Sequence, residues 1–168
     1  MAQVNIALMI ASEPLFFYLE DFTLLPYFRM TQRTKYFKNA QRYLSNHTDL
    51  KKRLSSILED QERQSLLSGY YFPDEMPFQL VMLISDNALN IHKCDLDNLV
   101  KSVLDGAQGL IYKDDRFCDS VFVQRQNSSK KNQLSLCFAP LNANPLNLYE
   151  NLKTHNTSHE KNNHTNTH

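Results

Sequence analysis

The stretch DLDNLVKSVLDGAQGLIYKDD, residues 95–115, decides most about the fold of this chain, because it joins a helical pattern to a dense set of charges. Its apolar residues recur every three or four positions, which predicts a helix from about Leu96 to Gly106 or Gly109. The apolar arc of this helix is formed by Leu99, Val100, Val103, Leu104 and Ala107. The opposite arc is polar, and we expect it to face solvent or a cleft with its residues Asp97, Lys101, Asp105 and Gln108.

Two aspartates stand at the start of this helix. Asp95 lies at the predicted N-terminus and Asp97 in the first turn, where free backbone N–H groups favour carboxylates, so a helix cap is the plain interpretation. Three features favour a functional site instead. Lys101 lies one turn after Asp97 on the same face, Asp105 lies one turn further, and a second acidic pair follows at 114–115.

Two common kinds of metal site do not fit this pattern. An EF-hand loop that began at Asp95 would have Val100 in place of its glycine and Gly106 in place of its bidentate acid. A zinc site fits little better, because His92 and Cys94 have no second pair of nitrogen or sulfur ligands at a suitable spacing. Clustered carboxylates instead favour a hard cation such as Mg²⁺, which takes oxygen ligands together with substrate phosphate.

Several strands are predicted on both sides of this helix. Phe78–Ser85 is strongly apolar and is expected to be a central strand. Ser120–Gln126 and Gln133–Ala139 are expected to be the two strands of a hairpin with its loop at residues 127–132. Val4–Ala11 is predicted to be a further strand, followed at residues 12–35 by an irregular, partly extended segment.

A long helix is expected from about Asn39 to Leu67, because leucine and isoleucine residues give that stretch an imperfect apolar stripe. The polar run at residues 46–48 is a possible break in this helix, and Thr48 or Asp49 would then cap a second one.

Length and composition indicate one folded domain. The chain has 168 residues, of which 42% are hydrophobic, and it contains no apolar run near the roughly 20 residues that span a bilayer. No basic residue precedes Arg29, so we expect no secretory signal, and the three cysteines have no paired spacing, which favours reduced thiols and a cytoplasmic protein. Asn, Thr and His dominate the C-terminal part, so we expect a domain at 1–140 and a disordered tail at 141–168. A metal-binding role for the histidines of this tail is the weaker alternative.

The formal net charge of +0 hides a strongly basic block at residues 29–53, which carries eight basic residues and one acid. Aromatic residues are interleaved with these cations, a combination suited to a DNA backbone and exposed bases. The alternative is a solvated helix face with its aromatic residues turned into the core. The candidate DNA contacts are Arg29, Arg33, Lys35, Lys38 and Arg42, together with Lys130 and Lys131.

Residues 95–115 resemble the signature of the RusA family of Holliday junction resolvases, D-x-D-N-x-x-K-x-x-x-D followed by a short loop and D-D. The matching residues are Asp95, Asp97, Asn98, Lys101, Asp105, Asp114 and Asp115. The basic segments 29–37 and 40–44 resemble the family's N-terminal part less specifically, and the likeness covers about residues 1–140. The chain departs from the family in having Cys94 before the first aspartate, a longer aromatic segment at 12–26, and the polar tail.

The resemblance implies a compact single α+β domain with a small mixed sheet packed against helices. It also implies a Mg²⁺-dependent endonuclease, with Mn²⁺ as a possible substitute, that acts as a homodimer on four-way DNA junctions in recombination and repair and makes paired symmetric nicks. By the same resemblance, Asp95, Asp97 and Asp115 would hold the metal and Lys101 would assist catalysis. Asn98 and Asp105 would then support these residues, and Asp114 would position Asp115.

Three other functions stay open on the sequence alone. The first is a nuclease for flaps or other branched DNA, and the second is a catalytically silent protein that binds branched DNA. The third is a plain folded domain with an acidic helix cap, which would lack a strongly salt-dependent affinity for DNA.

Overall fold

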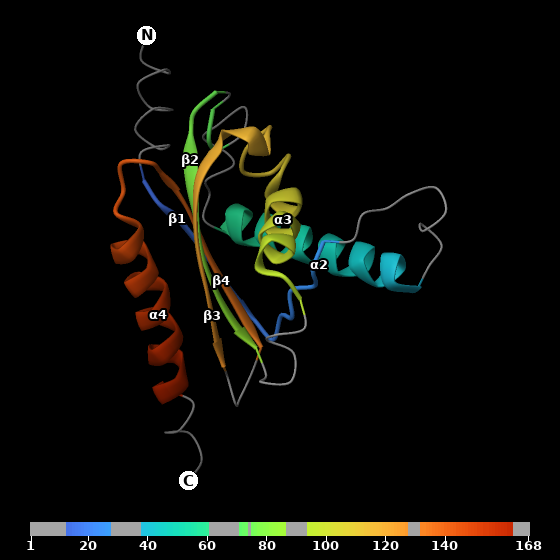
Figure 1. The fold of residues 1–168 in the computed structure, drawn as a ribbon. Helices are drawn as coiled ribbons and strands as arrows, with labels where there is room; N and C mark the ends of the chain where they lie inside the picture. Colours follow the sequence, from blue (N-terminus) through green and yellow to red (C-terminus); the bar gives the residue numbers. More distant parts are fainter. Residues whose placement is uncertain are drawn as a thin grey trace.

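A four-stranded mixed sheet forms the centre of the computed structural model, which describes residues 13–27, 38–60, 71–73, 75–86, 94–127 and 132–162 (Figure 1). The strand order is β1-β4-β2-β3. The strands are β1 (Leu15–Glu20), β2 (Phe78–Asp86), β3 (Cys118–Asn127) and β4 (Gln133–Pro140). Helices α2 (Lys38–Asp60) and α3 (Leu96–Ala107) lie on one side of this sheet, and α4 (Pro145–Asn162) lies on the other. The expected α+β single-domain architecture is confirmed.

Strand β2 is the central strand that the sequence predicts, because eight of its nine residues are buried. It pairs in parallel with β3 and antiparallel with β4. Leu80 and Met82 belong to the core that faces α2 and α3, whereas Val81 and Leu83 belong to the smaller core under α4. Burial on both faces explains why its sequence is a continuous apolar run and does not alternate.

The predicted hairpin of β3 and β4 is wrong, although both strands exist. Strand β2 lies between them, so β4 pairs with β1 and β2 and does not pair with β3. Burial explains this order. All residues of β4 after Gln133 are buried, so β4 needs a paired strand on each edge and a helix packed on each face. Strand β3 carries polar and charged residues along its length and occupies the edge.

The segment at 12–35 contains a strand that the sequence analysis did not predict. In β1, Leu15, Phe17 and Leu19 are buried, while the residues between them are partly exposed. Large apolar residues on both faces of β1 conceal this alternation from a search for period two. The strand predicted at Val4–Ala11 lies outside the described residues.

Helix α2 runs without interruption through residues 46–48, so the expected break is wrong. Asn46 stays helical because its side-chain amide accepts from Leu25 N at 3.0 Å and donates to Thr23 O at 2.9 Å. These bonds attach the helix to the segment after β1. Leu50, Leu54 and Leu58 form its fully buried stripe, and the predicted end at Leu67 lies outside the described residues.

The disorder expected at residues 141–168 is wrong for residues 145–162, because these residues form α4, which covers the second face of the sheet (Figure 1). Residues 163–168 lie outside the described residues. Leu148, Tyr149 and Leu152 are buried against β2 and β4. His155 stacks on Tyr18 with 3.5 Å between ring centroids. Three apolar residues at helical spacing are enough to hold α4 against the sheet, because this face of the sheet is apolar and would otherwise be exposed to water.

Within the described ranges, no helix has the length and apolar character needed to cross a membrane. The three cysteines Cys94, Cys118 and Cys137 are free thiols, as expected.

Candidate active site

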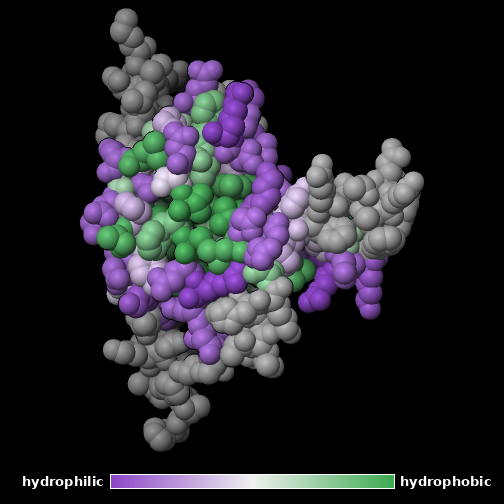
Figure 2. All heavy atoms as spheres, viewed as in Figure 1, coloured by the Kyte–Doolittle hydropathy of each residue, from purple (hydrophilic) through white to green (hydrophobic). Residues whose placement is uncertain are grey.

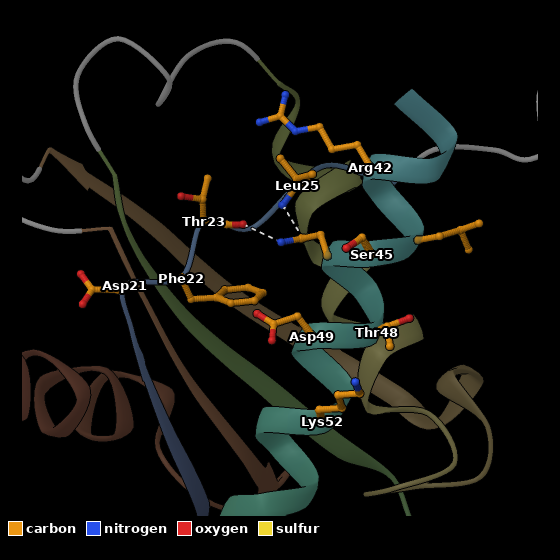
Figure 3. A pocket seen from close by; sticks show the side chains of 11 residues that line it. Asp21, Phe22, Thr23, Leu25, Arg42, Ser45, Thr48, Asp49 and Lys52 are labelled. Carbon is orange, nitrogen blue, oxygen red and sulfur yellow. Dashed lines mark hydrogen bonds between the residues drawn. The ribbon is translucent and has the colours of Figure 1, made fainter. Parts of the chain in front are cut away.

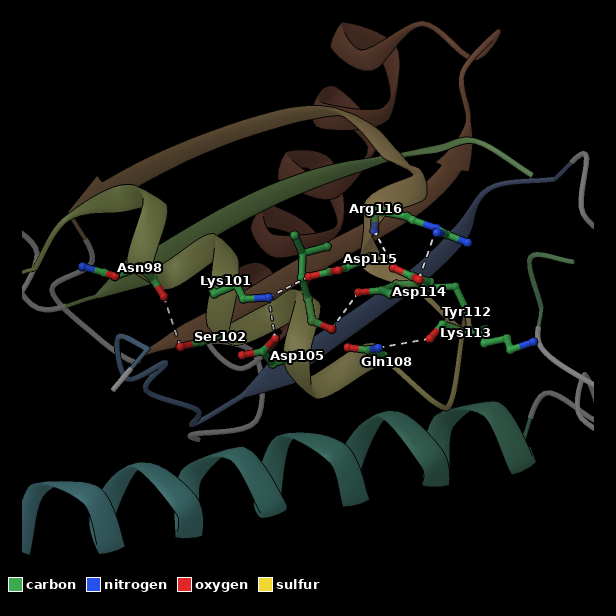
Figure 4. Close-up of polar contacts among 11 residues, drawn as sticks. Asn98, Lys101, Ser102, Asp105, Gln108, Tyr112, Lys113, Asp114, Asp115 and Arg116 are labelled. Atoms are coloured by element: carbon green, nitrogen blue, oxygen red, sulfur yellow. Dashed lines mark hydrogen bonds and ion pairs between the residues drawn. The ribbon is translucent and has the colours of Figure 1, made fainter. Parts of the chain in front are cut away.

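Helix α3 and the short 3₁₀ helix η1 (Asp115–Phe117) bring one ammonium group and two carboxylates together (Figure 4). The Nζ atom of Lys101 lies 2.7 Å from Asp115 Oδ2 and 2.8 Å from Asp105 Oδ1. The pair with Asp105 joins successive turns of α3, whereas the pair with Asp115 joins the helix to the segment that precedes β3. The polar arc of α3 therefore carries Lys101 and Asp105, and Asp115 reaches this arc from η1.

Close packing against α2 sets the position of α3. A Cβ atom on Gly106 would lie only 2.6 Å from Leu50 Cδ2, so glycine allows the two helices to approach at this point. One turn before the end of α3, Ser102 is buried and its hydroxyl donates to Asn98 O at 3.1 Å. Tyr43 of α2 packs beside this surface, and burial, followed by the charge of Asp105, raises the pKa of its hydroxyl to about 12.

The turn after α3 fixes the place of Asp115. Gly109 has a φ of 80°, a conformation that suits glycine and reverses the chain after the helix. The Tyr112 hydroxyl donates to Leu104 O at 2.7 Å, and Gln108 Nε2 donates to Lys113 O at 3.1 Å. These bonds tie the returning segment to the C-terminal end of α3.

Asp114 caps η1, because its carboxylate accepts from Arg116 N at 3.0 Å and pairs with Arg116 Nε at 3.2 Å. Its contacts thus hold the helix in which Asp115 stands. Asp114 is expected from the sequence to position its neighbour, and these contacts are compatible with that role.

Lys101 is held as a cation. Hydrogen bonds to Asp105 and then to Asp115 raise the pKa of its ammonium group well above the ordinary lysine value, although its side chain is 43% exposed. The group is fully charged at neutral pH and points toward solvent-accessible space. A fixed positive charge of this kind can stabilise negative charge that develops on a phosphate.

The two aspartates at the start of α3 are not the ion-pair partners of Lys101, which are Asp105 and Asp115. Asp95 precedes the helix, and its side chain makes no capping hydrogen bond. Asp97, in the first turn, lines an open groove together with Lys101. Asn98 contributes through its backbone, since its carbonyl accepts from Tyr27 N at 2.9 Å and from the Ser102 hydroxyl.

The described residues contain no group of three Asp, Glu, His or Cys side chains close enough to hold a metal ion. The expected meeting of Asp95, Asp97 and Asp115 around one cation is therefore not formed in this arrangement. Asp115 instead contacts the ammonium group of Lys101. The donor atoms of these side chains are carboxylate oxygens, which are the ligands that a hard cation prefers.

The described part of the basic block lies on α2, beside an open pocket of about 810 Å³ (Figure 3). Arg42 and Lys52 line this pocket, and Lys38 is exposed one turn before Arg42. Two other cations of the block have partners within the chain. Lys51 donates to Gln108 O, and Arg53 donates to Glu20 O and pairs with Asp49.

The described aromatic residue of this basic block, Tyr43, is buried. Tyr43 is only 5% exposed, so the alternative interpretation, with aromatic residues turned into the core, holds for this position. The other expected DNA contacts, Arg29, Arg33, Lys35, Lys130 and Lys131, lie outside the described residues.

Two contributors to this region are not evident from the sequence. Tyr43 contacts the polar side of α3, and its spacing of seven residues from Leu50 places both residues on one face of a helix. An apolar floor lies beside Asp97, where Val121 and Val123 of β3 meet α3. Their alternation in the strand was the available signal.

The fold and this site define a small α+β protein with a charged lysine–carboxylate cluster on the polar side of a short helix. Residues 27–136, more than half of the chain, match the family of endodeoxyribonuclease RusA. The chain belongs to the RusA family, and this membership indicates endodeoxyribonuclease activity. No curated protein matches the chain. Helix α4 lies beyond the matched residues.

Proposed function

We propose that this chain is a Mg²⁺-dependent endonuclease that resolves four-way DNA junctions by paired symmetric nicks. Membership of the RusA family supports the nuclease chemistry and branched DNA as its substrate. The observation that carries the proposal is the Lys101 cluster, because a fixed ammonium group beside carboxylates is suited to work on a phosphodiester.

The proposed reaction is hydrolysis of one phosphodiester on each of two opposing strands. A water oxygen forms a bond to phosphorus and loses a proton, while one P–O ester bond breaks and the departing oxygen takes up a proton to become a hydroxyl group. Negative charge grows on the phosphate oxygens during this step. Lys101 would neutralise part of that charge, and Asp105 and Asp115 would keep its ammonium group in place. Asp95 and Asp97 are the further proposed active carboxylates, on the resemblance of their spacing to the family signature.

The Mg²⁺ requirement is proposed from the chemistry of the ligands and is tested separately. We expect no cleavage in the presence of a chelator, cleavage after addition of Mg²⁺, and partial or full activity with Mn²⁺. Cleavage that persists at full rate in excess chelator would show that the activity needs no divalent cation.

The DNA arms are proposed to lie along α2. Lys38, Arg42 and Lys52 supply cations on the same side of the sheet as α3, whereas α4 covers the opposite side. The segment after β1 joins the two regions, since Thr23 and Leu25 line the pocket and Tyr27 bonds to Asn98 at the start of α3. The attachment of this segment both to the pocket and to the start of α3 supports this placement.

A homodimer is part of the proposal because a four-way junction has two-fold symmetry. Two cuts at symmetric positions need two active sites related by the same symmetry.

The decisive experiment uses a synthetic immobile junction with each strand labelled in turn. We expect nicks at symmetric positions on two opposing strands, and much slower cleavage of three-way, flap and duplex substrates of the same sequence. Faster cutting of flaps would replace junction resolution by a flap-directed activity. Binding without any cutting in Mg²⁺ or Mn²⁺ would indicate a catalytically silent protein.

Asp97→Asn tests the assignment of the active residues. We expect it to reduce cleavage at least about 100-fold and to leave junction affinity within about threefold, because it removes one charge without changing the shape of the side chain. Glu150→Gln on α4, on the far side of the sheet, is the matched control and is expected to cut normally. Undiminished nicking by Asp97→Asn would refute the role of Asp97.

A further inference from the structure

Strand β3 turns one cationic side chain toward α3. Arg125 pairs with Ile84 of β2, which belongs to the core that α2 and α3 cover, so its side chain lies on the α3 side of the sheet. On the same face of β3, Val121 and Val123 line the open groove beside α3, and Figure 2 shows hydrophobic side chains gathered between the sheet and this helix. An arginine that continues an apolar row needs a specific partner, because a charge beside apolar surface must be compensated.

A partner of Arg125 is the backbone immediately before α3. Its Nη2 atom donates to Cys94 O at 2.6 Å, from 31 positions further along the chain, and its Nε atom is buried. Cys94 directly precedes Asp95, the N-cap residue of α3. The guanidinium group thus holds the chain at the point where the two proposed active carboxylates, Asp95 and Asp97, begin.

The bonds of α3 itself fix this start only weakly. The side chain of Asp95 makes no capping hydrogen bond, and the bond from Leu99 N to Asp95 O measures 3.4 Å, which is long for a helix. Contacts from outside the helix therefore have a large share in placing its first turn. Tyr27 N donates to Asn98 O at 2.9 Å, and Arg125 supplies its contact about one turn earlier.

The charge of Arg125 suits this place because carboxylates are there. A helix N-terminus carries a partial positive charge, so a lone cation beside it is unfavourable, and Asp95 and Asp97 offset that cost. Burial raises the pKa of the Cys94 thiol, and the cation of Arg125 lowers it. The carboxylates of Asp86 and Asp95 raise it. The guanidinium group and the Asp95 carboxylate are therefore close enough to act on one side chain.

We propose that Arg125 is a positioning residue for the cleavage reaction, which holds the Cys94 carbonyl and so sets the direction of the Asp95 carboxylate. The proposal rests on the proposed function, in which Asp95 is an active carboxylate. In this role Arg125 does not touch the phosphodiester, so its loss slows the chemical step and leaves DNA binding nearly unchanged. A displacement of about 1 Å in a reacting group costs about 100-fold in rate.

Arg125→Met tests this role in the full chain with the synthetic junction. We expect single-turnover cleavage in Mg²⁺, at saturating protein, to slow about 10–100-fold, while junction affinity measured without divalent cations stays within about threefold. The slope of log affinity against log salt should equal that of the wild type, because no phosphate contact is lost. Weaker binding together with a slope reduced by about 0.9 would show that Arg125 contacts phosphate and would overturn the proposal.

Two comparison variants separate positioning from a general loss of structure. Arg125→Lys keeps a cationic donor for the carbonyl and should recover most of the lost rate. Arg53 also donates to a backbone carbonyl, Glu20 O at 2.9 Å, but from α2, so Arg53→Met should cut at the wild-type rate under saturating conditions. Circular dichroism checks that each variant is folded. A folded Arg125→Met protein that cuts as fast as the wild type overturns the proposal.

Hydrogen exchange gives a readout that does not depend on cleavage. The amides of residues 99–101 follow the first turn of α3 and should exchange about tenfold faster in Arg125→Met, whereas those of residues 105–107 at the other end should be unchanged. Equal exchange at residues 99–101 in both proteins would overturn the proposal whatever the cleavage rate. If the wild-type chain cuts no branched DNA, the nuclease function fails, and the exchange data still decide whether Arg125 holds the start of α3.

Discussion

At the scale of single residues, Lys101 and Tyr43 show how the site depends on neighbours from other elements. Lys101 is held by one carboxylate from its own helix and one from η1, so its position requires the turn after α3 to close correctly. Tyr43 approaches from α2, and its buried hydroxyl is sensitive to the charge of Asp105. The polar side of α3 is therefore shared between solvent and a second helix.

Tyr43→Phe is expected to change how stability depends on alkaline pH. In the unfolded chain the hydroxyl ionises near pH 10, whereas in the folded chain burial raises its pKa to about 12. Stability that is present below about pH 10 is therefore lost as the pH rises toward 12, by up to about 2–3 kcal/mol. The phenylalanine variant lacks this part of the loss.

Urea unfolding of both proteins between about pH 8 and pH 11.5 measures the effect. At about pH 8 the variant should be less stable by about 1 kcal/mol through loss of a hydroxyl contact, and the difference should shrink as the pH rises. A difference that stays constant over the whole range would show that Tyr43 ionises alike in the folded and unfolded chains.

At the scale of elements, α4 makes residues 145–162 a packed part of the domain. Its buried leucines cover the face of the sheet that α2 and α3 leave open. Ser135 and Gln133 of β4 donate to Asn156 Oδ1 at 2.9 Å each, so the helix is attached by polar contacts as well. We conclude that α4 is part of the folded domain.

Leu152→Ala should destabilise the protein by about 2–4 kcal/mol, because Leu152 is fully buried between α4 and the sheet. Leu146→Ala on the same helix is the matched control, since Leu146 is 58% exposed, and its effect should stay within about 0.5 kcal/mol. Chemical denaturation followed by circular dichroism gives both values. Equal and small effects would mean that α4 does not contribute to the core.

At the scale of the whole molecule, the net charge of +0 is a sum of unlike segments, and α2 alone carries five lysines and arginines against three acidic residues. Exposed cations of α2 lie on the side of α3, while α4 on the opposite side carries the pair of Lys153 and Glu150. A polyanion should therefore distinguish the two sides although the overall charge does not attract it.

Arg42→Gln combined with Lys52→Gln should weaken junction binding and reduce the slope of log affinity against log salt by about 2, or about 0.9 for each lost phosphate contact. Fluorescence anisotropy between about 50 and 200 mM salt, in the Asp97→Asn background that prevents cutting, provides the measurement. Lys153→Gln on α4 serves as the control for loss of a cation. If the Asp97→Asn background, the double variant and the Lys153→Gln control all show the same slope of log affinity against log salt, α2 does not contact the DNA.

The extent of successful prediction differs between local and long-range features. Helix α3, its end near Gly106, the central strand β2 and the existence of β3 and β4 were all predictable, because each depends on spacing within about ten residues. The break expected at Asn46 was wrong because bonds to Thr23 and Leu25 keep that residue helical. Those partners lie more than twenty positions away, beyond the reach of a local pattern.

For the candidate site, too, local features were predictable and long-range contacts were not. The spacing of Asp97, Lys101 and Asp105 on one face of a helix follows from sequence alone. The contact of Lys101 with Asp115 depends on how Gly109 turns the chain, and the structure shows an ion pair there in place of the expected cluster of three carboxylates.

The amino-acid sequence by itself determined the family, the polar face of α3 and most of the elements, since these are properties of residue type and of regular spacing. Only the tertiary structure decided that β2 separates β3 from β4, that α4 covers the far face, and that β3 is left at the edge. The reason is that strand order and helix placement follow from which apolar surfaces can be buried together, a quantity summed over the whole chain.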